Sequence, residues 1–266
     1  DVGMVLEAHG YLHGPGSRVL ESVQIPAALV LNDVASKPTQ LVINEVSETQ
    51  LEWQLFSYKS GDPEDPNSWL GNASGKMSTD TTSTTRKNET IEEIQARCTI
   101  YQNRQDFYEY MFKNEYELGD PLILNPENSG GLKGSHKSGV GNGFQLVNQI
   151  WRTNSEALCE LIIEPQSVRG EFEFYPVYFD CCIQIIASIV SSLVGEESVS
   201  YVPIAIEKFI LHHPPVGDQK LYCHTILQDD GRDAPGDWLA KDTIPAMMCV
   251  MAADGDVIAE AINFRV

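Results

Sequence analysis

An acid and an amide stand four residues apart in a stretch that is otherwise almost wholly apolar. Residues 177–194 read VYFDCCIQIIASIVSSLV, and the polar side chains Asp180 and Gln184 are followed at the same spacing by Ser188. A spacing of four residues aligns side chains on one face of a helix. Burying a carboxyl group costs several kcal/mol unless it finds a partner or stays protonated. The pattern favours a catalytic Asp180, although an aspartate that only caps neighbouring backbone remains an alternative.

The element that must position these side chains is a single buried helix. Pro176 precedes the run and Gly195 follows it, and these residue types are typical of a helix start and a helix end. The other faces carry Ile, Val, Leu, Cys and Phe, which predicts burial on nearly all sides. A membrane-spanning helix is the competing interpretation. It is disfavoured because the run is short, contains Asp180 and has no flanking Lys or Arg.

Composition excludes several classes of partner. The 266 residues carry 38 acids against 18 bases, a formal net charge of −20. Nucleic-acid surfaces and docking on anionic lipid both need clustered Lys and Arg, so neither partner is expected. The six cysteines show no spacing typical of a zinc site, and no metal is predicted. Cys181 and Cys182 lie in the buried run and indicate a reducing cytoplasm.

The first part of the chain predicts one helix followed by antiparallel strands. Helical spacing covers 3–14, where Gly14-Pro-Gly ends the helix. Alternating apolar and polar residues then predict strands over 19–25, 40–44, 50–58 and 69–77.

The second part repeats this plan after a polar connection. Residues 78–89 are almost without apolar side chains, short helices are predicted from Thr90 to about Ile100 and from Asp106 to Lys113, and 119–143 resemble a long loop. Strands are then expected over 144–152 and 157–164 before the buried helix, and over 201–212, 220–227, 244–252 and 257–264 after it. We therefore divide the chain into an N-terminal half (1–78), a linker (79–139) and a C-terminal half (140–266). Each half would wrap a sheet around one helix, and the two halves side by side would form one continuous sheet.

At the buried helix the chain resembles the dehydratase domains of modular polyketide synthases. The family pattern His-Pro-x-Leu-Leu-Asp-x-x-x-Gln stands here as YPVYFDCCIQ (175–184), with Pro176, Asp180 and Gln184 in register and Tyr175 at the position of the family histidine. Supporting similarities are WLGNASG (69–75), DFY (106–108), VPIAI (202–206) and DGDVIAE (254–260). The resemblance implies an α+β double hot-dog fold, with two antiparallel sheets each wrapped around a central helix.

The chain departs from the family pattern in two places. The catalytic histidine motif, His-x-x-x-Gly-x-x-x-x-Pro, would precede the first helix, so the resemblance places it and the first strands upstream of Asp1. His9 and His13 do not fit this motif, and we expect both to be exposed or half-buried helix residues. The family motif Tyr-Gly-Pro-x-Phe appears as VGNGF (140–144), which keeps Gly141 and Phe144 but has Val140 for the tyrosine.

The resemblance implies loss of water from a 3-hydroxyacyl thioester to give the 2-enoyl thioester. Asp180 would protonate the departing hydroxyl, and Gln184 would orient the carboxyl of Asp180. Burial would raise the pKa of Asp180 by more than the helix N-terminus lowers it. The substrate-binding residues would be Tyr175, Pro176, Gly141 and Phe144.

The same resemblance implies the partners. The substrate would be carried on the phosphopantetheine of an acyl carrier protein, no other cofactor is expected, and neighbouring synthase domains would be further partners. A homodimer is left open. Because carrier proteins are acidic, a local basic patch is expected, with the candidates Arg86, Lys87, Arg97, Arg104, Lys133 and Lys137.

Two other functions stay open. One is a dehydratase-like domain without dehydration activity, with a branching, cyclising or structural role beside a ketosynthase, which the changes at Tyr175 and Val140 favour. The other is an unrelated binding module in which the buried Asp180 is structural.

Overall fold

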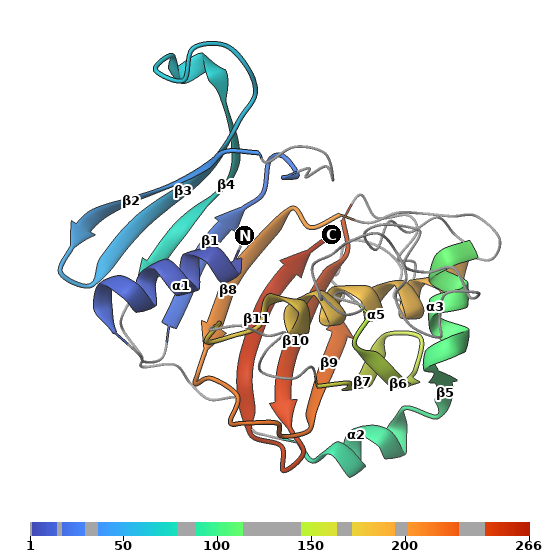
Figure 1. Ribbon diagram of the computed structural model, residues 1–266. Helices are drawn as coiled ribbons and strands as arrows, with labels where there is room; N and C mark the ends of the chain where they lie inside the picture. The colour runs from blue at the N-terminus through green and yellow to red at the C-terminus, as the bar shows by residue number, and fades with distance from the viewer. Residues whose placement is uncertain are drawn as a thin grey trace.

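The computed structural model describes residues 2–14, 18–29, 37–78, 89–113, 145–163, 172–194, 202–228 and 243–266. Within these residues the strands form a single eleven-stranded antiparallel sheet (Figure 1), in the order β2-β3-β4-β1-β8-β11-β10-β9-β7-β6-β5. The strands are β1 (Arg18–Gln24), β2 (Thr39–Ser47), β3 (Gln50–Tyr58), β4 (Trp69–Ser78), β5 (Ile100–Asn103), β6 (Val147–Arg152), β7 (Glu156–Leu161), β8 (Ala205–Leu211), β9 (Leu221–Leu227), β10 (Pro245–Ala252) and β11 (Val257–Arg265).

The sheet becomes continuous where β1 of the first half pairs with β8 of the second. This antiparallel ladder runs from the pair Arg18 and Leu211 to the pair Gln24 and Ala205. Strands β2, β3 and β4 lie on one side of the junction, and the remaining strands lie on the other. The prediction of two halves joined into one sheet is therefore confirmed.

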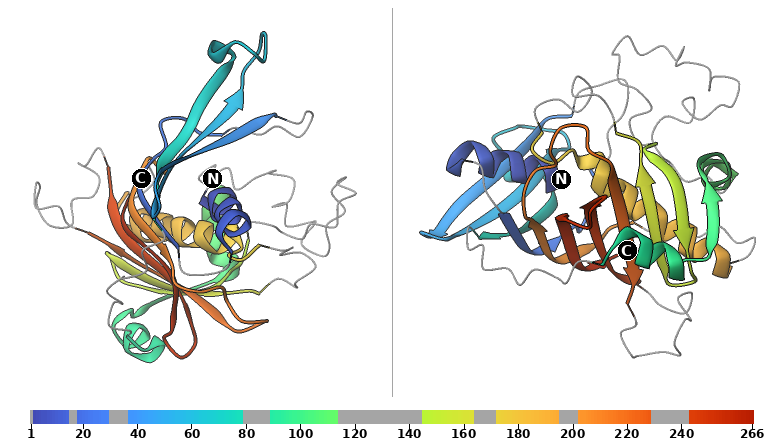
Figure 2. Two further views of the ribbon diagram at one scale, coloured as in Figure 1. Left: turned by 90° about the vertical axis from the view of Figure 1, so that its left-hand side faces the viewer. Right: turned by 90° about the horizontal axis from the view of Figure 1, so that it is seen from below.

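Two helices lie on the same face of this sheet, one in each half. Helix α1 (Val2–His13) packs against the first half and α5 (Pro176–Val194) against the second, and Figure 2 shows both inside the curve of the sheet. In α1, Val5 and Leu6 are completely buried and belong to the same apolar cluster as Trp53 of β3. The fold is the double hot-dog that the sequence predicted.

Helix α5 is the centre of the second half. It contacts β6, β7, β9 and β10. Tyr178, Cys181, Ile186 and Ala187 are between 0% and 7% exposed, at positions that together span every face of the helix. The prediction of a helix buried nearly all round is thus confirmed for the side chains described, which end at Val190.

The connection between the halves differs from the prediction at one point. Helix α2 (Ile91–Arg97) begins with a capping box in which Thr90 and Glu93 each satisfy the other's backbone N–H. It ends at Arg97, because the chain turns extended and Ile100 begins the edge strand β5, which pairs with β6. Our expectation of a helix reaching about Ile100 was wrong. Helix α3 (Arg104–Lys113) follows β5 directly.

Helix α2 covers the face of the sheet opposite α5 (Figure 2). Its buried residues Ile91 and Ile94 pack in a second apolar cluster with Leu158 of β7, Tyr222 of β9 and Met251 of β10. The two faces of the second half are therefore both covered, by α5 on one side and by α2 on the other.

Candidate active site

Asp180 lies in the second turn of α5, where it is half-buried. Its Oδ2 accepts a hydrogen bond of 2.6 Å from Nε2 of Gln184, which is 4% exposed. The pair joins residues four apart on one helix, as their spacing predicted. Within the described part of the chain, Gln184 is the one residue that donates a hydrogen bond to this carboxyl.

The surroundings of Asp180 favour its protonated form. Burial raises the pKa of Asp180 above its usual range, and the hydrogen bond from Gln184 opposes this shift only in part. The position of Asp180 near the start of a helix also favours the charged form. A carboxyl group with a raised pKa can carry a proton to a reacting group near neutral pH.

A tyrosine from the linker completes the network and was missed as a site residue by the sequence. Tyr108 of α3 is 8% exposed, and its hydroxyl lies 3.4 Å from Oε1 of Gln184. The same hydroxyl accepts a 3.1 Å hydrogen bond from the backbone N–H of Val147, at the start of β6. The sequence offered Tyr108 only as part of a similarity to the family, because no local spacing connects it with a residue 76 positions away.

The two residues before Val177 shape the start of α5. A Cβ atom added to Gly3 would lie 2.5 Å from Cγ of Pro176, so the first turn of α1 packs directly on the beginning of α5. Tyr175 is buried and meets the ring of Tyr178 edge to face, with 5.4 Å between ring centroids. The structure thus places both residues next to the turn that carries Asp180, and their substrate-binding role stays a prediction. Gly141 and Phe144 lie outside the described residues.

His9 corrects one expectation from the sequence. It is 4% exposed, not exposed or half-buried, because its Nδ1 accepts a 2.9 Å hydrogen bond from Nε of the completely buried Arg18. Arg18 also forms an ion pair with Glu173, two residues before Tyr175. His9 therefore links α1 to β1 and to the segment that leads into α5. The side chain of His13 is outside the described part.

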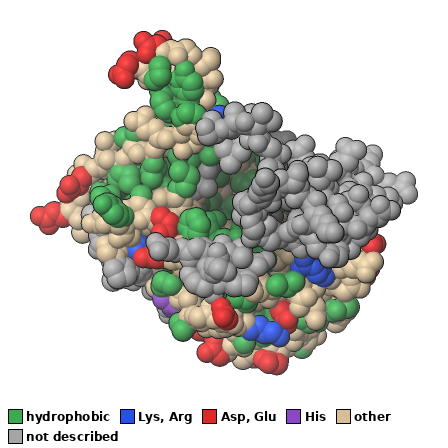
Figure 3. Space-filling view, in the orientation of Figure 1, with side chains coloured by type: hydrophobic (Ala, Val, Ile, Leu, Met, Phe, Trp, Pro, Cys, Tyr) green, Lys and Arg blue, Asp and Glu red, His purple; other side chains and the backbone are tan. Residues whose placement is uncertain are grey.

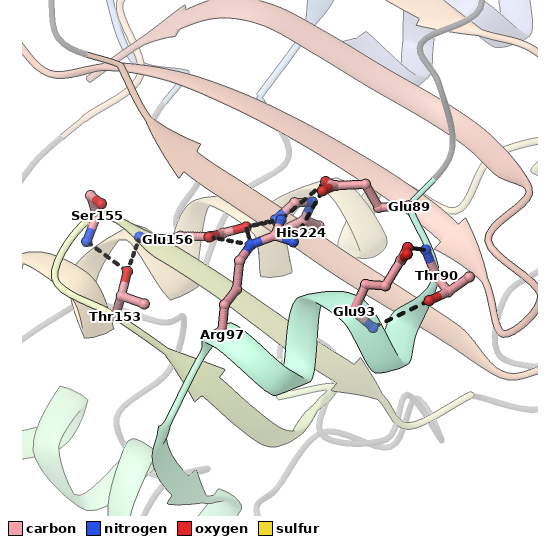
Figure 4. Close-up of polar contacts among 8 residues, drawn as sticks. All are labelled: Glu89, Thr90, Glu93, Arg97, Thr153, Ser155, Glu156 and His224. Carbon is pink, nitrogen blue, oxygen red and sulfur yellow. Dashed lines mark hydrogen bonds and ion pairs between the residues drawn. The ribbon is translucent and has the colours of Figure 1, made fainter.

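A second polar centre lies on the opposite face of the sheet, beneath α2 (Figure 4). Glu156 of β7 accepts hydrogen bonds from Arg97, and its Oε1 lies 2.7 Å from Nε2 of His224, which is completely buried. Arg97 also donates to both carboxylate oxygens of Glu89, each at 3.0 Å. Burial alone raises the pKa of Glu156, but His224 and Arg97 together lower it to about 2. We call these four residues the outer cluster. Sequence reasoning missed it, because its members come from three distant segments.

Among the described residues, few of the bases proposed for carrier binding lie free on the surface near the candidate site. In the space-filling view of Figure 3, hydrophobic side chains gather over the first half of the sheet, whereas Lys and Arg are few. Of the bases proposed for a carrier-protein patch, Arg97 belongs to the outer cluster. Arg104 donates to the backbone carbonyls of Gln145 and Val147, at 2.7 and 3.2 Å. The other four lie outside the described residues.

None of the helices described is long and apolar enough to cross a membrane. Among the same residues, no three His, Cys, Asp or Glu side chains are grouped so that they could hold a metal ion.

The fold is shared with solved structures of polyketide synthase enzymes. An inactive histidine-to-phenylalanine variant of the CurJ dehydratase, in complex with a compound, superposes with a TM-score of 0.76 at 20% identity, over 99% of this chain and 79% of that one. An inactive aspartate-to-asparagine variant of the CurK dehydratase gives 0.71 at 18% identity, over 99% and 80%. A trans-acyltransferase polyketide synthase enoyl-isomerase gives 0.66 at 12% identity, over 99% and 86%.

The amino-acid sequence matches one protein-family model over most of its length. No curated protein matches the chain. The family model described as the polyketide synthase dehydratase N-terminal domain matches residues 86–266, which include α3, the whole of α5 and every strand of the second half of the sheet. The chain therefore belongs to the polyketide synthase dehydratase family.

Proposed function

We propose that this protein removes water from a 3-hydroxyacyl thioester and releases the 2-enoyl thioester, with Asp180 as the proton donor. One observation carries the proposal. The half-buried carboxyl of Asp180 has a raised pKa, and its hydrogen-bond partner among the described residues is an uncharged amide. A raised pKa makes the carboxyl keep its proton to higher pH than an ordinary aspartate, and a carboxyl that keeps its proton can donate it when a hydroxyl group departs.

The reaction needs a base as well as this acid. A base removes the proton from C2, the C2–C3 double bond forms, and the C3 hydroxyl leaves as water with the proton of Asp180. The four histidines whose side chains are described are engaged elsewhere, with Arg18 (His9), Glu260 (His212), Asp256 (His213) and Glu156 (His224). We therefore assign the base to the histidine that the family resemblance places ahead of α1.

The packing of the two helices supports this assignment. Gly3 lies against Pro176, four residues before Asp180, so the first turn of α1 lies beside the first turn of α5. Inactive variants of the related CurJ and CurK dehydratases carry replacements of a histidine and of an aspartate, respectively. Both observations agree with one His and one Asp as the acid–base pair.

The second candidate is a dehydratase-like domain that moves protons without releasing water. The fold similarity to an enoyl-isomerase favours it, because in an isomerisation a double bond shifts while the composition of the substrate is unchanged. The tyrosine at position 175, where the family pattern has histidine, points the same way. Asp180, held by the hydrogen bond from Gln184, would then carry the proton between carbon atoms.

The proposed partners follow from family membership. The substrate would arrive on the phosphopantetheine of an acyl carrier protein, beside neighbouring synthase domains, with no further cofactor, in the cytoplasm. The charge of −20 leaves little basic surface for an acidic carrier protein, and Arg97 and Arg104 are already engaged within the chain. We therefore expect carrier binding to depend on bases outside the described residues, or on apolar contact.

The experiment uses the full-length protein with a 3-hydroxyacyl carrier protein or a pantetheine thioester mimic. Dehydration predicts a product lighter by one water, detected by intact mass. A 2-enoyl thioester offered in parallel tests the second candidate, since isomerisation would change its absorbance and NMR spectrum at constant mass. A folded full-length protein that leaves the hydroxyacyl substrate unchanged would refute the dehydratase proposal.

A further inference from the structure

The side-chain amide of Gln184 can turn either Nε2 or Oε1 toward Asp180, and this orientation decides whether Asp180 can donate its proton to a substrate. In the observed orientation Nε2 faces Oδ2 of Asp180, and Oε1 faces the hydroxyl of Tyr108. In the reversed orientation Oε1 would face the carboxyl, where it could only accept a hydrogen bond. A protonated Asp180 would then donate its proton to Gln184 rather than to a substrate.

The hydroxyl of Tyr108 discriminates between these two orientations. Its oxygen already accepts a hydrogen bond from Val147 N–H, so its single proton remains for Gln184 Oε1. Reversal of the amide would leave this buried hydroxyl proton without that acceptor, which is unfavourable in an apolar interior. Tyr108 is 8% exposed and Gln184 is 4% exposed, so water has little access to either group.

We propose that Tyr108 is a positioning residue that holds the Gln184 amide in the orientation that donates to Asp180, so that the proton of Asp180 stays available to the reacting group. The part of this inference that concerns a reacting group rests on the proposed function, whereas the part that concerns the amide does not. The network is directional: Val147 N–H donates to Tyr108, Tyr108 donates to Gln184, and Gln184 donates to Asp180. Through it, the linker helix α3 sets the state of an acid on α5.

Within the described part of the chain, few other ionisable groups act on this network. Beside Asp180, the described neighbour is the thiol of Cys181, and the groups acting on Tyr108 are Cys181, Cys159 and Arg104. Burial raises the pKa of both thiols well above the usual value, so both are uncharged at neutral pH. Arg104 carries the one charge, above the ring of Tyr108 at 5.2 Å from its centroid. A change in the titration of Asp180 can therefore be traced to the amide.

A titration of Asp180 tests the orientation without requiring turnover. The chain is labelled with ¹³C-aspartate, and the side-chain carboxyl signal of Asp180 is assigned by its loss in Asp180→Asn. The pKa of Asp180 is then measured in wild type, Tyr108→Phe, Gln184→Leu and the double variant. Removal of the donor in Gln184→Leu should raise the pKa of Asp180 by about half a pH unit or more, the size expected for loss of one ordinary hydrogen bond. Tyr108→Phe should raise it in the same direction. In the Gln184→Leu background, Tyr108→Phe should cause no further change.

Tyr101→Phe is the matched control, because it removes the hydroxyl of a tyrosine on β5 that is 55% exposed, and it should leave the titration of Asp180 unchanged. The inference is overturned if Tyr108→Phe leaves the pKa of Asp180 where it was, or if its effect persists in full without Gln184.

If Tyr108→Phe does not fold, 3-fluorotyrosine at position 108 keeps the volume and donates more strongly, so it should lower the pKa of Asp180. No shift would then overturn the inference. A protein that titrates as expected but does not dehydrate would instead refute the proposed function alone.

Discussion

The two faces of the second half-sheet each carry a half-buried acid, and the pKa values of the two acids are shifted in opposite directions. On the inner face, Asp180 receives its hydrogen bond from the uncharged amide of Gln184, and burial raises its pKa. On the outer face, Glu156 is bound by Arg97 and His224, and its pKa falls to about 2 (Figure 4). Both are carboxyl groups in partly buried positions, so the donors around them make the difference.

Glu156 therefore has the properties of a structural carboxylate, whereas Asp180 has those of a carboxyl that can donate a proton. Glu156 is charged throughout the physiological range, and its bonds join α2 to β7 and β9. Asp180 has no such cation among the described residues, so its carboxyl keeps a proton to higher pH than an ordinary aspartate. A pH-dependent role is therefore expected of Asp180 and not of Glu156.

The largest effect is expected from Asp180→Asn. An amide of the same volume can still accept the hydrogen bond of Gln184, but it cannot supply a proton. We expect dehydration to fall by roughly 100-fold or more, the contribution that proton transfer commonly makes. The thermal midpoint at neutral pH should be unchanged or higher, because the buried carboxyl is removed. Product mass and thermal unfolding measure the two effects, and a folded variant with undiminished turnover would end the catalytic assignment.

The opposite result is expected from Glu156→Gln. It should lower stability at neutral pH by about 1–3 kcal/mol, the cost of disturbing buried charged hydrogen bonds, and leave turnover unchanged. Because the folded pKa of Glu156 is depressed, this stabilisation is present above its usual pKa of 4.5 and is lost as pH falls toward about 2. The difference between variant and wild type should shrink over that window in denaturant unfolding.

Glu52→Gln is the control for this comparison. Glu52 is an exposed partner of Lys76 at 4.0 Å, and its substitution should change stability by no more than about 0.5 kcal/mol. Loss of turnover in a folded Glu156→Gln protein would show that the outer cluster is not merely structural.

A smaller effect is expected from Gln184→Ala. It removes the group that orients Asp180 but leaves the proton donor, so turnover should fall on the order of tenfold, less than for loss of the acid itself. Gln102→Ala is the matched control. Gln102 lies on β5, and its side-chain amide accepts a 2.8 Å hydrogen bond from Ser188 of α5, the helix that carries Gln184. Loss of this amide should leave turnover nearly unchanged. Equal losses in the two variants would show that α5 is sensitive to any polar change, and not to the orientation of Asp180.

The sequence predicted those helices and strands whose own residue pattern determines their conformation. The apolar run with Pro176 before it predicted a helix over 177–194, and α5 covers Pro176–Val194. Alternation of apolar and polar residues, clearest in QLEWQL, predicted a strand over 50–58, which is the extent of β3. The pair Asp180 and Gln184 was predictable for the same reason, because both residues lie on one helix.

What the sequence could not predict depends on contacts between distant segments. Strand β5 is short and lies at the edge of the sheet, so its pairing with β6 rather than its own pattern makes it a strand. Tyr108 meets Gln184 across 76 residues, and Arg97 meets Glu156 across 59. His9 was expected to be accessible because its helix alone does not reveal Arg18 on β1. In each case the partner lies on another element.

The most direct test of the central claim is the pH dependence of turnover in wild type, Gln184→Ala and Glu156→Gln. If the protonated form of Asp180 is the acid, turnover should fall as pH rises through the raised pKa of Asp180. Gln184→Ala removes a hydrogen bond that lowers this pKa, so the midpoint should move to higher pH, while Glu156→Gln should leave it in place. A midpoint that stays fixed in Gln184→Ala, or that moves in Glu156→Gln, would contradict the assignment of Asp180 as the proton donor.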